Sequence, residues 1–279
     1  MFEHIEREIR DTARGLLERK EIGYFIGWET AQFGSGTAPS FIFEPGDVSK
    51  LVFNENCVNM LAKYLLDDRY SECKIGLCVR GCESRAVNRM LKDGQIKREN
   101  IYLVGIPCDG IKAEKCEICN HRNPLIYDIL LGKPMPERPI EDRFHGVDEF
   151  EKKSAKERYD FWASQFSKCI RCYACRNVCP ACNCVECYVD QHKTGWQGKR
   201  CSVAENQNFG LTRAFHVGDR CIECGECERV CPVGIPLMLL NRKLIKDVND
   251  LFGERENGLD SETISALGTF DKEDHDEFM

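Results

Sequence analysis

Apolar positions follow two different periods in the first half of the chain. In residues 1–20, Phe2, Ile5, Ile9, Leu16 and Leu17 recur at helical spacing between charged residues, which predicts an amphipathic helix that packs on a core. Short apolar runs predict strands at residues 23–28, 40–43, 74–80 and 101–107. Helical patterns follow at residues 54–68 and 83–95.

Nearly unbroken apolar strands joined by helices are typical of a parallel sheet that is covered on both faces. We therefore predict an α/β domain, a small parallel sheet with flanking helices, over residues 1–134. Three prolines among charged residues at 132–146 mark its end. The remaining regions are a linker and one helix at 135–168, a cysteine-rich domain at 169–236, and a C-terminal helix and acidic tail at 237–279. That last helix should begin after Pro236 and end near Gly253, followed by a flexible tail.

Nineteen of the 279 residues are cysteines. An odd number of cysteines in a chain long enough to build a core argues against a disulfide framework, so we expect reduced thiolates that bind metal. The start lacks the basic and apolar segments of a secretory signal, and no apolar run has the length of a membrane span, which indicates a soluble, cytoplasmic protein. The net charge of −7 argues against nucleic acid as a partner.

The cysteine-rich domain contains two copies of the spacing CxxCxxCxxxCP, at residues 169–180 and 221–232. Three cysteines at every third position let a tight loop supply three thiolates to an iron-sulfur cube. Structural zinc is the alternative, but zinc sites use paired CxxC motifs or Cys/His knuckles. The two runs resemble those of dicluster bacterial ferredoxins, in which the last cysteine of each run binds the other cluster.

This resemblance implies an α+β ferredoxin-like domain that holds two 4Fe-4S clusters. The first cluster would be bound by Cys169, Cys172, Cys175 and Cys231. The second would be bound by Cys221, Cys224, Cys227 and Cys179. The long insert at 181–220 departs from the pattern of stand-alone ferredoxins, and we expect it to form a docking surface or another metal site.

A third group of cysteines lies in the predicted α/β domain, where ligands collect beyond the carboxyl ends of parallel strands. Its members are Cys82, Cys108, Cys116 and Cys119. Four thiolates suit zinc or a third 4Fe-4S cluster, and the two clusters nearby favour iron. Cys57, Cys73 and Cys78 are expected in the core, although Cys78 could exchange roles with Cys82.

A possible fourth site begins inside the insert, where Cys182, Cys184 and Cys187 form a CxCxxC motif. Cys201 or a histidine such as His192 or His216 would be its fourth ligand. The alternative is that these thiols pack around the neighbouring clusters and tune their potentials.

The words GCESRAV, DGQI and GIPCDG resemble the N-terminal region of the deazaflavin-coenzyme hydrogenase and dehydrogenase beta-subunit family. Related iron-sulfur subunits accompany formate dehydrogenases and heterodisulfide reductases. The resemblance implies an electron-relay subunit of a cytoplasmic, anaerobic oxidoreductase complex of the formate dehydrogenase, hydrogenase or heterodisulfide reductase type. Its partners would be a catalytic or flavin subunit at one end and a soluble ferredoxin or another subunit at the other.

The alternative within the same family is a beta subunit that itself contains FAD and oxidises or reduces a carrier such as the deazaflavin coenzyme. The chain has no convincing flavin signature, Ser/His/Asp set, acid and base pair or Walker loop, so no catalytic residue is assigned. We expect that the chain is not catalytic alone, and that its redox chemistry belongs to two clusters in the ferredoxin-like domain and a third in the α/β domain.

Overall fold

The computed structural model describes residues 2–34, 36–67, 73–111, 113–117, 119–138, 143–191 and 193–268. Its strands are β1 (Tyr24–Thr30), β2 (Thr37–Ile42), β3 (Ile75–Val79), β4 (Ile101–Gly105) and β5 (Ile129–Leu130). Its α-helices are α1 (Phe2–Glu18), α2 (Gly81–Lys92), α3 (His145–Glu151), α4 (Ala155–Ser167), α5 (Ala174–Asn177), α6 (Val203–Val217), α7 (Glu226–Arg229) and α8 (Leu237–Phe252). Short 3-10 helices are η1 (Pro45–Lys50), η2 (Ala62–Leu66), η4 (Arg98–Asn100), η5 (Glu114–Cys116), η6 (Tyr188–Asp190) and η7 (Ala266–Gly268).

The N-terminal half is built on one five-stranded sheet in the order β2-β1-β3-β4-β5. Strands β1, β3, β4 and β5 run parallel, which confirms the predicted parallel sheet for the inner strands. Strand β2 differs, because it follows β1 through a short connection and pairs with it antiparallel at the edge. All five residues of β3 are buried, as its unbroken apolar run predicts.

Helix α1 confirms the predicted amphipathic helix, with Ile5, Ile9 and Leu16 buried in the same core as the sheet. The predicted helix at residues 54–68 is wrong. The Asn54 side chain accepts a hydrogen bond from the backbone N–H of Asn56 at 2.8 Å, which starts a turn. In the described residues 54–67, only η2 is helical.

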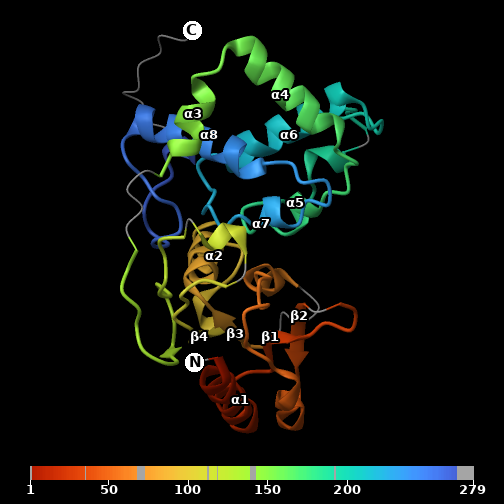
Figure 1. Cartoon of the computed structure of the whole chain (residues 1–279). Coiled ribbons are helices and arrows are strands. Elements are labelled where there is room, and N and C mark those ends of the chain that lie inside the picture. Colours follow the sequence, from red (N-terminus) through yellow and green to blue (C-terminus); the bar gives the residue numbers. More distant parts are fainter. Residues whose placement is uncertain are drawn as a thin grey trace.

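The C-terminal half contains α3 to α8 (Figure 1). One helix was predicted over residues 147–168, but the structure has two, because Ser154 and Glu157 form a capping box that starts α4 anew. Helix α8 confirms the prediction, with Pro236 before it and Gly253, at φ 85°, after it. In the described residues 143–191 and 193–268 the regular elements are helices, so the strands of the predicted α+β domain are not found there.

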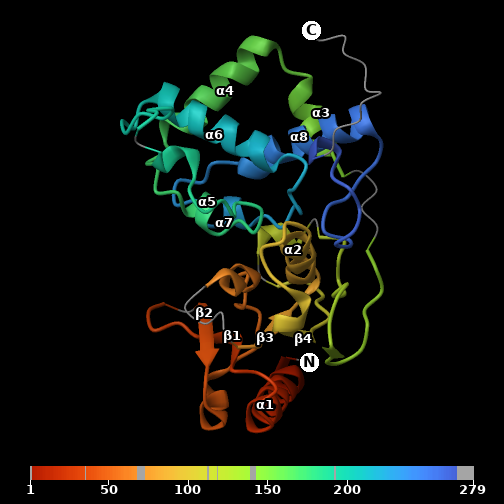
Figure 2. The same ribbon diagram turned by 180° about the vertical axis from the view of Figure 1, so that it is seen from behind.

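The two halves pack against each other where α2 of the sheet half meets α7 of the helical half (Figure 1). From behind, the segment that follows α8 descends beside α2 (Figure 2). Arg85 donates to the carbonyl of Asn257 at 2.7 Å, and Asn88 donates to that of Gly258 at 3.0 Å. The prediction of a flexible tail is therefore wrong for this part, and the acidic end at 269–279 lies outside the described residues.

None of the helices in the described part of the chain combines the length and apolar character needed to cross a membrane.

Candidate metal centres

The four cysteines predicted to form a site in the sheet half line one cavity, which we call the α/β cavity. They are Cys82, Cys108, Cys116 and Cys119. Cys82 lies in the first turn of α2, directly after β3, and Cys108 lies three residues after β4. Since β3 and β4 are neighbouring parallel strands, their carboxyl ends bring these two thiols to the same edge of the sheet.

The loop that carries Cys116 and Cys119 reaches this edge because Gly81 has no side chain. A Cβ atom at Gly81 would lie 2.1 Å from the carbonyl oxygen of His121. The backbone N–H of Cys108 also donates to the carbonyl of Arg122 at 2.7 Å, which attaches the loop to the end of β4. Cys78 instead lies in the core of the sheet, so the alternative in which it replaces Cys82 is not supported.

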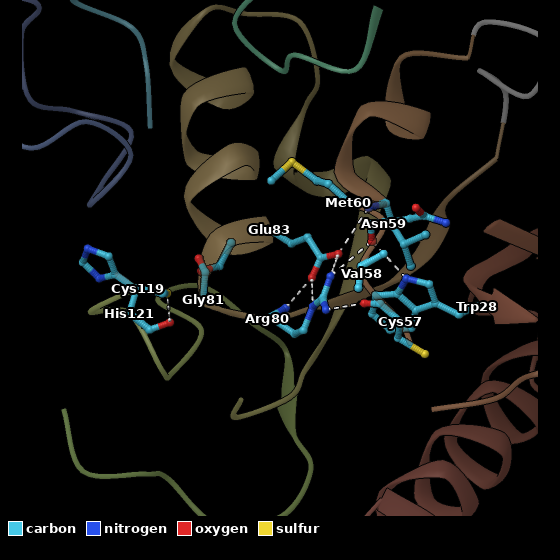
Figure 3. Close-up of polar contacts among 12 residues, drawn as sticks. Trp28, Cys57, Val58, Asn59, Met60, Arg80, Gly81, Glu83, Cys119 and His121 are labelled. Atoms are coloured by element: carbon cyan, nitrogen blue, oxygen red, sulfur yellow. Dashed lines mark hydrogen bonds and ion pairs between the residues drawn. The ribbon is translucent and has the colours of Figure 1, made fainter. Parts of the chain in front are cut away.

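A buried arginine, Arg80, also lines the α/β cavity, and Figure 3 shows its polar contacts. Arg80 is 2% exposed and donates to both carboxylate oxygens of Glu83 at 2.9 Å and to the carbonyls of Cys57 and Asn59. Its guanidinium also lies over the Trp28 ring, 4.7 Å from the centroid. Burial raises the pKa of Cys82 to about 12, and the charge of Arg80 opposes that rise. Arg80 therefore makes the thiolate form of Cys82, which is the form that metals bind, easier to reach than it would be with burial alone.

The four cysteines of the first ferredoxin-like group also line one cavity. Cys169, Cys172, Cys175 and Cys231 surround it together with apolar residues of α4, α6 and the start of α8. Cys175 interacts electrostatically with the other three thiols. We call this group the outer site, because Cys172 is exposed.

The second ferredoxin-like group is buried more deeply, and we call it the inner site. Cys179 interacts electrostatically with Cys221, Cys224 and Cys227, although it belongs to the other CxxCxxCxxxCP run. Cys179, Cys221 and Cys227 are all buried. The last cysteine of the first run thus lies beside the thiols of the second run.

The two runs share a backbone conformation as well as a spacing. Arg171 and Tyr173 in the first run, and Glu223 and Gly225 in the second, all have positive φ angles between 52° and 71°. This conformation turns the N–H of Arg171 toward the Cys169 sulfur at 3.4 Å, and the N–H of Glu223 likewise bonds to Cys221. Hydrogen bonds to sulfur of this kind help to set the potentials of iron-sulfur clusters.

Arg213 on α6 lies between the outer and inner sites. It is 4% exposed, and its Nη2 donates to the carbonyl of Cys175 at 3.0 Å. It also interacts electrostatically with Cys179 and Cys227 of the inner site. Burial lowers the pKa of Arg213, but these thiols raise it more, so the side chain keeps its positive charge between the two groups.

The possible fourth site is brought together only in part. Cys182, Cys184 and Cys187 line a cavity of about 690 Å³ with His216, Arg176 and Arg220. Cys201 lies elsewhere, with its thiol 3.7 Å from the carbonyl of Ile170, because the loop before α6 folds against the outer site. The set with Cys201 is therefore not assembled, and His192 lies outside the described residues. A hydrogen bond from the Cys182 thiol lowers the pKa of Cys179 to about 5, which ties Cys182 to the inner site.

Groups of thiols around a cavity suit a cluster, because each iron of a cube binds its own thiolate. Among the residues that the structure describes, no three His, Cys, Asp or Glu side chains are placed to bind a single metal ion.

The α/β cavity and the inner site are adjacent across the junction of the two halves. Cys224 of the inner site lines a cavity together with Cys82, Cys116 and Cys119. Beside it, the fully buried Glu226 pairs with Lys115 and accepts hydrogen bonds from Arg229 at 2.7 and 2.9 Å. Gly225 allows this approach, because a Cβ atom there would lie 2.6 Å from that of Lys115.

Sequence reasoning missed Arg80, Arg213 and the Lys115–Glu226 pair. Arg213 had a signal, since it follows Asn206, Phe209 and Gly210 at helical spacing on the buried face of α6. Arg80 directly follows the apolar β3 run, but nothing in its spacing shows that it is buried. Lys115 and Glu226 are 111 residues apart, so no local pattern could pair them.

Comparison with known proteins supports both halves of the sequence interpretation. Residues 165–235 match the family described as a 4Fe-4S dicluster domain. The F420-dependent formate dehydrogenase subunit beta of Methanocaldococcus jannaschii is 21% identical over 341 residues, covering 85% of this chain and 88% of that protein. The F420-dependent formate dehydrogenase 1 subunit beta of Methanococcus maripaludis is 23% identical over 337 residues, covering 82% and 84%. The chain is thus similar over most of its length to formate dehydrogenase beta subunits, and residues 165–235 in its C-terminal half match a 4Fe-4S dicluster domain.

Proposed function

We propose that the chain is an iron-sulfur electron-relay subunit of an oxidoreductase complex of the formate dehydrogenase type, working in the cytoplasm. The relatives are named as beta subunits of formate dehydrogenases, and the dicluster domain supplies one-electron chemistry. The observation that carries the proposal is the shared cavity of Cys224, Cys82, Cys116 and Cys119. This cavity joins the α/β cavity to the inner site, and Arg213 lies between the inner site and the outer site, so the three thiol groups would form a series that ends at an exposed edge.

In this proposal each group holds one 4Fe-4S cluster. Cys82, Cys108, Cys116 and Cys119 would ligate the cluster of the α/β cavity. The inner site would use Cys179, Cys221, Cys224 and Cys227, and the outer site would use Cys169, Cys172, Cys175 and Cys231. When bound, the clusters supply the electron transfer, and the protein contributes ligation, burial and hydrogen bonds that set their potentials.

Several features of the described residues fit iron-sulfur clusters in these places. The outer site is lined by apolar side chains such as Phe166, Phe209 and Leu237, which limit access of water. Each group has a buried arginine beside it, Arg80 at the α/β cavity and Arg213 at the other two. These cations offset the negative charge that four thiolates bring to a cluster.

The partner at the α/β end would be a catalytic or flavin subunit, and the partner at the outer site would be a soluble carrier or another subunit. FAD has no assigned residues in the chain. The fourth cavity, around Cys182, Cys184 and Cys187, would tune the inner site through the hydrogen bond from Cys182 to Cys179.

Anaerobic purification with iron, sulfide and flavin analysis tests the proposal. We expect about twelve iron atoms per chain, the content of three such clusters, and no stoichiometric flavin. Complete reduction by dithionite should change the visible absorption without any turnover of formate by the isolated chain. Stoichiometric FAD with carrier-dependent turnover by the isolated chain would contradict the relay function and favour the flavin-containing alternative. Zinc in place of iron would contradict both.

A further inference from the structure

The outer site is the point at which the proposed series of thiol groups reaches the surface. Of the twelve cysteines proposed as ligands, Cys172 is the one that is exposed. Its neighbour Ile170 is also 59% exposed. Because electron transfer between proteins weakens steeply with distance, a carrier must approach an edge of this kind.

The insert places a loop directly beside this edge. The buried Arg171, which precedes Cys172, donates to the carbonyl of Arg200 at 3.0 Å and also to that of Gly198. The Cys201 thiol lies 3.7 Å from the carbonyl of Ile170. Cys201 also interacts electrostatically with Cys169 of the outer site. Residues 198–201 are therefore fixed against the loop that carries the exposed ligand.

The charge of this surface is opposite to that of the whole chain. The net charge is −7, yet residues 191–203 contain Lys193, Lys199 and Arg200 and no acidic residue. Lys199 and Arg200 are exposed, as is Lys168 next to Cys169. The nearby carboxylate of Glu205 is turned inward, where it accepts a hydrogen bond from the backbone N–H of Gly198 at 2.9 Å.

An aromatic side chain adds apolar area to the same loop. Trp196 is 69% exposed, while the next residue, Gln197, is buried and bonded to Glu205 on α6. An exposed tryptophan and isoleucine with basic neighbours resemble the apolar centre and charged rim of a transient protein interface. We call Lys168, Ile170, Trp196, Lys199 and Arg200 the basic docking patch.

We propose that the basic docking patch binds a small acidic iron-sulfur carrier protein of the ferredoxin class, which exchanges electrons with the complex at Cys172. The exchange is a transfer of one electron: the cluster of one protein is oxidised, the cluster of the other is reduced, and no bond or proton changes place. Opposite charge selects this partner, because an acidic carrier is steered toward the basic docking patch and repelled by the rest of the acidic chain. The inference rests on the proposed relay function.

Stopped-flow mixing of the anaerobic holoprotein with a reduced acidic two-cluster ferredoxin tests it. The double variant Lys199→Glu/Arg200→Glu reverses two charges of the basic docking patch. We expect its second-order rate at low ionic strength to fall at least tenfold, by an amount that shrinks as salt is added. The matched control is Lys152→Glu/Lys156→Glu, the same charge change on exposed side chains at α3 and α4, and we expect less than a twofold effect.

Three measurements separate the outcomes. The iron content and the extent of dithionite reduction should be the same in the unmodified protein and in both variants, since neither pair ligates metal. A cluster missing from the unmodified protein would count against the relay function alone. Equal rates for the two double variants, or a rate that does not depend on salt, would overturn the docking proposal. Binding to vesicles with anionic lipids, lost in Lys199→Glu/Arg200→Glu while the ferredoxin rate is unchanged, would assign the basic docking patch to a membrane surface instead and also overturn it.

Discussion

The α/β cavity and the ferredoxin-like pair gather the same number of thiols per group in different ways. In the pair, three ligands of each group lie within seven residues, and the loop itself directs N–H groups at sulfur through residues at positive φ. In the α/β cavity the ligands come from the ends of two strands and from a loop that closes over Gly81. The first arrangement depends on local backbone conformation, and the second depends on the whole sheet.

The buried arginines of the two regions also differ in their hydrogen-bond partners. Arg80 is paired with the fully buried Glu83, so this carboxylate balances part of the charge that Arg80 brings to the α/β cavity. Arg213 donates to the carbonyl of Cys175, and its buried Nε has no hydrogen-bond partner among the described residues. We expect Arg80 to serve mainly the structure of the α/β cavity, and Arg213 to act mainly on the potentials of the outer and inner sites.

The largest expected effect comes from removing a ligand of the α/β cavity. Cys108→Ala should lower the iron content by about four atoms per chain, the content of one 4Fe-4S cluster, and leave the EPR signals of the ferredoxin-like pair. The control Cys73→Ala removes a cysteine that packs against the sheet core, and should keep all the iron. If Cys108→Ala keeps all its iron, Cys108 does not ligate a cluster. If it also loses the EPR signals of the ferredoxin-like pair, the two regions are not separate sites.

The next effect concerns the contact that joins the two regions. Glu226→Gln would leave Lys115 buried without its counter-charge, and breaking a buried pair in this way costs about 3–5 kcal/mol. We expect a lower midpoint in anaerobic denaturation and a slower transfer between the α/β cavity and the inner site. The exposed pair of Glu149 with Lys152 gives the matched control, since Glu149→Gln should leave the denaturation midpoint nearly unchanged.

The third effect distinguishes the two arginines. Arg213→Gln removes a buried positive charge beside the outer and inner sites, so reduced clusters lose stabilisation and both potentials should fall. Two unit charges about 10 Å apart interact by about 1–2 kcal/mol at an effective dielectric constant of 20, which corresponds to a shift of tens of millivolts in a one-electron potential. Potentiometric titration followed by EPR measures the shift. Arg213→Lys should recover most of it, and an unchanged potential in Arg213→Gln would show that Arg213 is structural only.

The sequence predicts the locally spaced ligands of the ferredoxin-like pair more directly than the ligands that the whole sheet brings together in the α/β cavity. The spacing of Cys169, Cys172 and Cys175 predicts a three-thiol loop without any knowledge of the fold, because the ligands are close in the chain. Cys82 and Cys108 could be predicted to meet only after the strands before them were recognised. The helix expected at Asn54 fails because a side-chain turn competes with it. The Lys115–Glu226 contact is a product of how the halves pack, so no periodicity in either half contains it.

The smallest expected effect concerns the insert at 181–220, for which the sequence predicts either a docking surface or another metal site. Cys201→Ser should leave the iron content unchanged, because its thiol lies against the carbonyl of Ile170 and away from the cavity of Cys182, Cys184 and Cys187. Iron analysis of Cys184→Ser alongside Cys201→Ser compares the two parts of the insert, since both thiols are exposed and both are replaced by serine. We expect both variants to keep their iron, because Cys201, the fourth cysteine of the predicted set, lies away from the cavity that Cys182, Cys184 and Cys187 line. A loss of about four iron atoms in Cys184→Ser alone would place a further cluster in that cavity, and the same loss in Cys201→Ser would mean that the loop beside the outer site folds differently.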